Sequence, residues 1–143
     1  MPVKILFSLA GILFLLACSG VDKKQDVNQI NDIWVAVRIG EKDLSVGTDG
    51  DPTSLPQLEI MVSEMKYKGS DGCNQLMGGL IELNVHTIRF GLAAGTQMMC
   101  PEMEITDLFN RTLPEVRSWE IKNNQLHLFD EQGTELMQLK KLD

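Results

Sequence analysis

Asp71-Gly72-Cys73-Asn74 and Thr96-Gln97-Met98-Met99-Cys100-Pro101 are the two stretches that decide how this chain folds. Each carries one cysteine, and these are the only cysteines beyond the N-terminal segment. The first stretch lies among glycines, where a backbone can turn tightly or adopt positive φ angles. The second runs into a proline and then into a pattern typical of a helix. Together they predict a structural corner more readily than an active site.

The first twenty residues have the layout of a secretory signal peptide. A single lysine, Lys4, precedes an uncharged and mostly apolar run over 5–16, and small residues follow at 17–20. The apolar run is shorter than the roughly 20 residues that a membrane-spanning helix needs. An uncleaved anchor or a buried apolar helix is the alternative interpretation.

Leu15-Leu16-Ala17-Cys18 resembles the bacterial lipobox, in which the signal peptidase cuts just before a cysteine that carries a diacylglyceryl group. The resemblance implies a signal peptide over 1–17 and a mature chain that starts at an acylated Cys18. Two or more acyl chains make such anchoring stable. Ser19 follows this cysteine, and in Gram-negative lipoproteins that resembles the outer-membrane sorting signal. We therefore expect a lipid-anchored envelope protein at the outer membrane, facing the periplasm.

The charge of the chain argues against one class of partner. The formal net charge is −7, and the densest basic run, Lys140-Lys141, is two residues long. Binding to nucleic acid would need a patch of lysine and arginine to neutralise phosphates. We expect no nucleic-acid partner, and the acidic balance favours solubility beside an anionic membrane surface.

The mature chain divides into a tether and one domain. The segment over 18–31 is polar and weakly patterned, which predicts a flexible tether, and the domain is expected over 32–143. A long loop is expected over 40–56, with room for a short strand near 44–46, and 91–99 stays unassigned. Strands are expected where β-branched and aromatic residues gather or alternate, at 33–39, 58–62, 65–68, 80–83, 86–90, 118–122, 125–129 and 135–141.

One helix is expected over about 101–112. Pro101 suits a first helical turn, and Pro114 disfavours a helical residue at Leu113, so the helix should stop or kink there. The apolar side chains of this segment recur at helical spacing, at Ile105, Leu108, Phe109, Thr112, Leu113 and Val116. A mainly β, α+β domain follows: a strongly curved antiparallel sheet or a small barrel, with the helix packed on one side or end.

Several motifs along the chain are shared with one domain family. They are Asp32-Ile33-Trp34, Pro56-x-Leu58-x-Ile60, Gly72-Cys73-Asn74-x-x-x-Gly78, Ile88-x-Phe90-Gly91, Thr96-x-Met98-x-Cys100-Pro101 and Leu126-x-Leu128. In these motifs the chain resembles the META domain of HslJ-type proteins over roughly 32–139. The Gly-Cys-Asn and Thr-x-Met-x-Cys-Pro elements, in that order, are the specific part. Leu80 departs from the pattern, since an aromatic residue is usual there.

The resemblance implies a small β-rich envelope or secreted domain that is often lipidated. In bacteria such domains are associated with heat shock or envelope stress and with tolerance of novobiocin. The resemblance brings no catalytic residue, so none is assigned here.

Cys73 and Cys100 leave three interpretations open. An exported pair of cysteines most often forms a disulfide, which we rank first. Two buried free thiols rank second, and a reactive or metal-binding pair ranks third. A zinc site would need about four convergent ligands, whereas His86 and His127 are scattered singly along the chain. We expect no metal and no cofactor.

Other residues of the two stretches are expected to act structurally. Asn74 and Thr96 are suited to side-chain hydrogen bonds that hold irregular backbone, with a ligand-binding role as the alternative. Met98, Met99 and Met103 fit an irregular core better than a copper site. The acidic residues of the long loop lack the spacing of a calcium site, and a solvated loop is expected; they are Asp43, Asp49 and Asp51.

The sequence predicts a non-catalytic envelope protein, attached to the membrane through Cys18, that protects against stress by binding another envelope protein. The alternative is a binder of small apolar molecules, because curved sheets and small barrels offer concave apolar surfaces. A thiol-dependent enzyme ranks last. A binder of small molecules should contain an apolar cavity, whereas an interaction module should combine a filled core with an exposed apolar patch.

Overall fold

The computed structural model describes residues 24–45 and 54–142, and antiparallel strands make up most of this part of the chain. The strands follow the order β6-β5-β4-β3-β1-β10-β9-β8, with two short strands beside β1 and β5. Their bounds are β1 Ile33–Ile39, β2 Lys42–Asp43, β3 Gln57–Met61, β4 Lys66–Ser70, β5 Gln75–Leu83, β6 Ile88–Phe90, β7 Ala94–Gly95, β8 Ser118–Lys122, β9 Gln125–Phe129 and β10 Glu135–Lys141.

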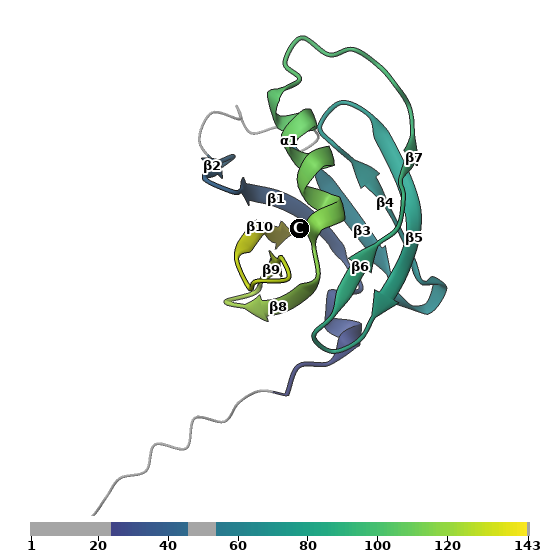
Figure 1. Cartoon of the computed structure of the whole chain (residues 1–143), viewed down its shortest axis with the longest axis vertical. Helices are drawn as coiled ribbons and strands as arrows, with labels where there is room; N and C mark the ends of the chain where they lie inside the picture. The colour runs from purple at the N-terminus through teal and green to yellow at the C-terminus, as the bar shows by residue number, and fades with distance from the viewer. Residues whose placement is uncertain (1–23, 46–53, 143) are drawn as a thin grey trace, which may run out of the picture.

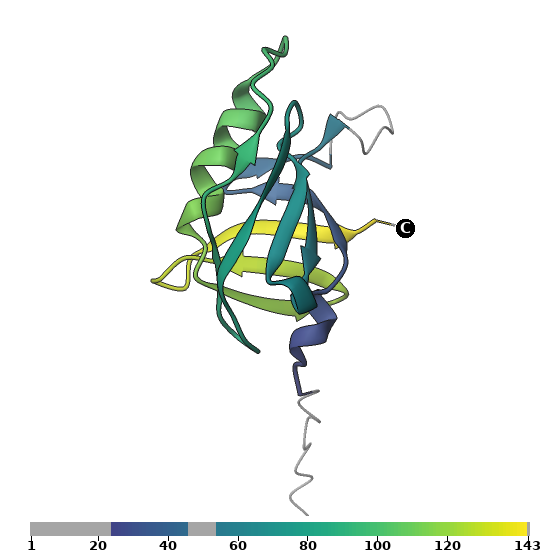
Figure 2. The same cartoon turned by 90° about the vertical axis from the view of Figure 1, so that its right-hand side faces the viewer.

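The two ends of the sheet meet, so the sheet curves into a nearly closed barrel (Figures 1 and 2). Ile88 N donates to Arg117 O over 3.1 Å, and Trp119 N donates to His86 O over 2.9 Å. These bonds join β8 to the start of β6. Closure removes exposed sheet edges, which otherwise invite pairing with other chains. The predicted small antiparallel barrel with one helix is confirmed.

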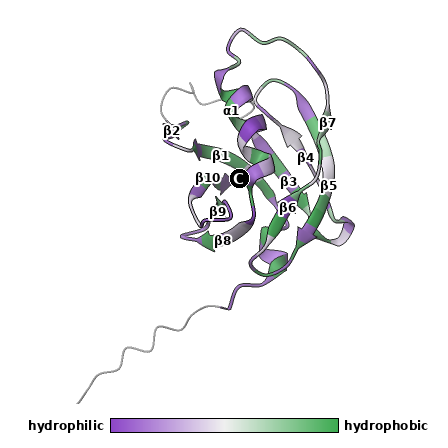
Figure 3. Cartoon of the chain, viewed as in Figure 1, coloured by the Kyte–Doolittle hydropathy of each residue, from purple (hydrophilic) through white to green (hydrophobic). Residues whose placement is uncertain are grey.

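The barrel is filled by buried apolar side chains, and Figure 3 shows hydrophobic residues along the strands that carry them. Leu126 and Leu128 of β9 are fully buried, as is Leu139 of β10. The two tryptophans are also buried, and each ring N–H has a carbonyl partner. Trp34 Nε1 donates to Ile30 O over 2.9 Å, and Trp119 Nε1 donates to Asn84 O over 2.8 Å. Both buried indole N–H groups are therefore hydrogen-bonded, as is usual for buried tryptophans.

Helix α1, Glu104–Thr112, lies along one side of the barrel and continues into the 3-10 turn η4, Leu113–Glu115. It buries Phe109, and the turn buries Leu113 just before Pro114. The helix starts about three residues later than the expected 101–112. Pro101 therefore precedes the helix instead of lying in its first turn.

The N-terminal boundary differs from the prediction. A 3-10 helix, η1 Val27–Ile30, packs on the barrel and is closed by a capping box between Asp26 and Gln29. Ile30 is fully buried and belongs to the hydrophobic core. The expected tether over 18–31 is therefore wrong for its last residues, and the folded part begins before Asp32.

Two expected features of the first half are also corrected. Strand β5 covers nine residues instead of the expected 80–83, so Gly78 lies inside the strand. A Cβ atom on Gly78 would lie 2.6 Å from Tyr67 Oη, so a glycine is required where the tyrosine ring crosses the strand. The short strand expected near 44–46 is β2, two residues earlier.

No helix among residues 24–45 and 54–142 is long and apolar enough to span a membrane. The predicted signal peptide and Cys18 lie outside the described residues, as do Asp49 and Asp51.

Candidate functional site

Asp71-Gly72-Cys73-Asn74, called the corner from here on, is a tight turn between β4 and β5. Asp71 N donates to Asn74 O over 3.0 Å. Asp71 Oδ1 accepts hydrogen bonds from Cys73 N (2.9 Å) and Asn74 N (2.6 Å). Gly72 has φ of +95°, a conformation that glycine adopts without strain. An aspartate that bonds to backbone N–H groups two and three residues ahead is a common way to fix such a turn.

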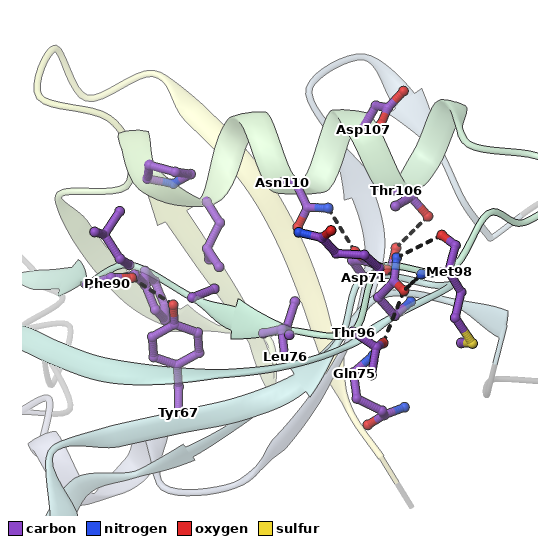
Figure 4. A pocket seen from close by; sticks show the side chains of 18 of the residues that line it. Tyr67, Asp71, Gln75, Leu76, Phe90, Thr96, Met98, Thr106, Asp107 and Asn110 are labelled. Atoms are coloured by element: carbon purple, nitrogen blue, oxygen red, sulfur yellow. Dashed lines mark hydrogen bonds between the residues drawn. The ribbon is translucent and has the colours of Figure 1, made fainter.

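The same aspartate attaches helix α1 to the corner (Figure 4). Asn110 Nδ2 donates to Asp71 Oδ2 over 2.7 Å, and Thr106 Oγ1 donates to Asp71 O over 3.2 Å. Asp71 is 3% exposed, and Thr106 is 2% exposed. Hydrogen bonds to a charged group are among the stronger ones, so this contact fixes where the helix lies relative to the strands.

Asn74 holds the segment that leads into the helix. Its Oδ1 accepts from Thr96 Oγ1 (3.0 Å) and from Met98 N (2.6 Å), and its Nδ2 donates to Met98 O over 3.4 Å. Cys73 and Cys100 form a disulfide with a Cα–Cα distance of 6.0 Å. The side-chain bonding expected of Asn74 and Thr96 is present, and the pairing of the cysteines agrees with the first-ranked interpretation.

A groove of about 730 Å³ lies between α1 and the strands β5 and β7. Its floor includes Tyr67, Leu76 and Phe90. The rings of Tyr67 and Phe90 meet edge to face with centroids 5.0 Å apart, and Tyr67 Oη donates to Gly91 O over 2.7 Å. Burial raises the pKa of the Tyr67 hydroxyl, so this group stays a neutral donor at ordinary pH.

Apolar side chains lie exposed where the groove meets solvent. Leu92 is 98% exposed, Met99 89%, Ile81 61% and Met98 55%, and all four line the groove. They are called the rim from here on. The expectation that Met98 and Met99 fill the core is therefore wrong, because the bonds from Asn74 hold this segment on the surface.

The chain matches the META domain family over residues 28–143. It belongs to the META domain family. No curated protein matches it. Among solved structures, a protein solved by NMR has TM-score 0.58 and 23% identity, covering 78% of this chain and 89% of that one. An NMR structure of a protein from Burkholderia xenovorans has TM-score 0.58 and 16% identity, covering 82% and 89%. A crystal structure of a DUF4847 family protein from Bacteroides vulgatus has TM-score 0.53 and 14% identity, covering 80% and 96%. At these identities the likeness shows the fold alone.

The histidines of this META domain lie away from the corner. His86 is exposed in the turn before β6. His127 Nδ1 lies 3.0 Å from Glu135 Oε2, and Arg38 pairs with the same carboxylate. The described residues include no group of three His, Cys, Asp or Glu side chains arranged to hold a metal ion. Because Cys73 and Cys100 form a disulfide, neither of them is a free thiolate beside a histidine.

Sequence reasoning missed part of what holds the META domain together at the groove. Asp71 belongs to the corner sequence, but the sequence did not predict its hydrogen bonds to the helix residues Thr106 and Asn110. The spacing Asp-Gly-x-Asn is a signal for the turn itself, because aspartate at the first position of a turn bonds forward. No local signal identifies Asn110 as its partner, since the two residues are 39 positions apart.

Proposed function

We propose that this protein is a non-catalytic, lipid-anchored binding module of the bacterial cell envelope, whose groove receives an apolar segment of another envelope protein. The observation that carries the proposal is the rim. Exposed apolar side chains on a domain surface mark interaction sites when they gather in one place, and the four rim residues gather along one groove.

A filled barrel favours a protein partner over a ligand held inside the barrel. The core side chains, both tryptophans included, are buried together, while the groove opens at the surface. Two of the four rim residues are methionines, whose flexible thioether side chains adapt to partners of different shape. We infer that the binding surface is adaptable, which suits a protective role during envelope stress or antibiotic exposure.

The anchor at Cys18 completes this proposal. Its support is the lipobox-like stretch before Cys18 and the short distance along the chain from there to η1. An acylated Cys18 would hold the domain close to the membrane surface, because only a few residues separate Cys18 from η1. Intact mass of the protein from native membranes tests this step: loss of 1–17 with added acyl groups supports it, and an uncleaved, unacylated chain overturns it.

The groove proposal is tested by photo-crosslinking in cells from two exposed methionine positions. Met99 belongs to the rim, and Met77 is similarly apolar and 63% exposed but does not line the groove. A photo-reactive amino acid at position 99 should give a defined crosslinked product, which Leu92→Asp should remove. The same amino acid at position 77 should not give it. Equal products from both positions, or none from 99, would contradict the proposal.

A small apolar molecule is the second candidate for the same groove. The aromatic floor of Tyr67 and Phe90 and the groove volume favour it, because pockets for small ligands have volumes of about 300–1,000 Å³. A ligand that binds the folded state raises the melting temperature by mass action. A hydrophobic dye that stabilises the protein, and loses this effect in Phe90→Ala, would favour the small molecule.

A further inference from the structure

Strand β7 presents a free edge to the groove. Its only strand neighbour in the described chain is β5, with Leu76 opposite Gly95 and Met77 opposite Ala94. Figure 2 shows β7 between β5 and helix α1, so the edge that β5 does not cover faces the helix. The groove separates the two elements there. Among the described strands β2 also has a single neighbour, β1, but its residues do not line the groove.

The direction of the backbone groups at this edge follows from a hydrogen bond between Thr96 and Gln75. Thr96 N donates to Gln75 O over 3.0 Å, which turns the N–H of Thr96 toward β5. Successive residues of an antiparallel strand point their N–H and C=O groups to opposite edges. The N–H and C=O of Gly95 therefore point away from β5, toward the groove. An unpaired pair of this kind is a template for one more strand.

The charge of the groove limits what such a strand can carry. The charged residues that line it are both acidic, Asp71 and Asp107, and none of its described lining residues is Lys, Arg or His. Neither aspartate takes part in an ion pair within the described residues, although other acids of the chain do, such as Glu59 with Lys68. Asp107 is exposed on α1, one helical turn from Asn110, which binds Asp71. A positively charged occupant would be favoured here, and a second copy of this acidic chain would not.

We propose that the groove binds an extended, apolar and basic segment of a partner polypeptide, which adds as a strand to the free edge of β7. Backbone hydrogen bonds to Gly95 give the segment its direction, the rim covers its apolar side chains, and a lysine or arginine lies beside Asp107. This is the mode of recognition by strand addition, in which main-chain bonds supply affinity and side-chain pockets supply specificity. The inference rests on the groove being the binding site proposed above.

The test uses an array of short synthetic peptides and the full-length protein. In each peptide apolar residues alternate with threonine, and one central position is lysine, glutamine or glutamate. A second set carries N-methyl groups on alternate backbone amides, which removes donors without changing side chains. Strand addition predicts that lysine peptides bind tightest and that N-methylation of the amide that donates to Gly95 O weakens them about tenfold, since this backbone hydrogen bond is lost.

The charge is tested with Asp107→Asn and a matched control, Glu131→Gln, which lies in the turn between β9 and β10. Asp107→Asn should reduce the preference for lysine over glutamine, which we expect to be about two- to fivefold for an exposed charge pair. Glu131→Gln should leave this preference unchanged. A preference that survives in Asp107→Asn overturns the assignment of the cation.

The outcomes separate this inference from the proposed function. If N-methylated and unmodified peptides bind equally and Met99→Gln weakens both, the groove binds a segment that does not pair with the free edge of β7. The inference is then wrong and the proposed function stands. If no peptide binds above scrambled controls, the inference is wrong. If in addition the crosslink at position 99 is absent, the proposed function fails as well.

Discussion

The barrel wall and the groove side of this molecule are built on different principles. The wall formed by β1, β8, β9 and β10 is held by buried apolar side chains and by antiparallel strand pairing, which a register shift interrupts once between β1 and β10 and once between β10 and β9. The groove side is held by a buried carboxylate, an asparagine and a disulfide, and it leaves apolar side chains exposed. Polar groups and a covalent bond can hold irregular backbone open where apolar burial would close it. The hydrogen bonds of Asn74 and the Cys73–Cys100 disulfide therefore keep the segment 96–99 in the position where it lines the groove.

The largest effect is expected in the wall. Trp34 is fully buried, and its indole also binds Ile30 O. Trp34→Ala should destabilise the fold by about 3–5 kcal/mol, because large buried aromatic side chains leave cavities that do not collapse. Urea unfolding followed by circular dichroism measures this loss. A loss below about 1 kcal/mol would show that the wall does not depend on its apolar core.

The next effect concerns the disulfide of the groove side. It closes a loop with a sequence separation of 27. Replacing both Cys73 and Cys100 with serine should cost about 3–4 kcal/mol in the chain-entropy account of loop closure. The double variant should also lose binding at the groove under conditions where it is still folded. Unchanged binding in the folded double variant would mean that hydrogen bonds alone hold the rim.

A smaller effect distinguishes two aspartates that fix turns. Asp71→Asn replaces Oδ2 with an NH2 group, which cannot accept the hydrogen bond from Asn110 Nδ2, so we expect a loss of about 2 kcal/mol in the free energy of unfolding. Asp130 Oδ1 accepts from Gln132 N and Thr134 N in a wall turn, and an asparagine oxygen can accept both bonds. Asp130→Asn should therefore be close to neutral. Thermal and urea unfolding of the two variants compare them, and equal losses would refute the role assigned to Asp71.

The smallest effect concerns acid stability of the wall. The hydrogen bond and charge of Lys141 lower the pKa of Asp32 below its ordinary value of 3.8. Because the folded pKa is depressed, this contribution is present above the unfolded pKa and is lost as pH falls through the folded pKa. Both side chains are partly exposed, so the contribution is small. Urea unfolding between neutral and strongly acidic pH should show a shallower acid-side decline in Asp32→Asn than in the natural chain.

The sequence predicted the wall better than the groove side for a physical reason. The strands at 118–122, 125–129 and 135–141 were correct, because they alternate with period two around turn residues. Asn123 and Asn124 adopt φ of 51° and 61°, as a tight hairpin requires. These signals are local, so one segment of sequence is enough to detect them.

The groove side depends on contacts between distant segments, which leave weaker local signals. Gly78 was identified only as a residue of a shared motif, and nothing local indicated that it makes room for Tyr67 within a strand. Ile30 looked like part of a tether, although it lies in the core. The rim methionines looked like core residues, because composition does not reveal that Asn74 holds their backbone at the surface. The disulfide was foreseen because the compartment and the number of cysteines suggested it.

The most direct test of the groove as a binding site uses the methionine methyl groups. The chain has eight methionines, and NMR of ε-methyl-labelled protein reports on each of them separately. We predict that the lysine-containing peptide shifts the methyl signals of Met98 and Met99, while those of Met65 and Met77 stay in place. Unchanged signals at Met98 and Met99, with or without shifts elsewhere, would contradict the account.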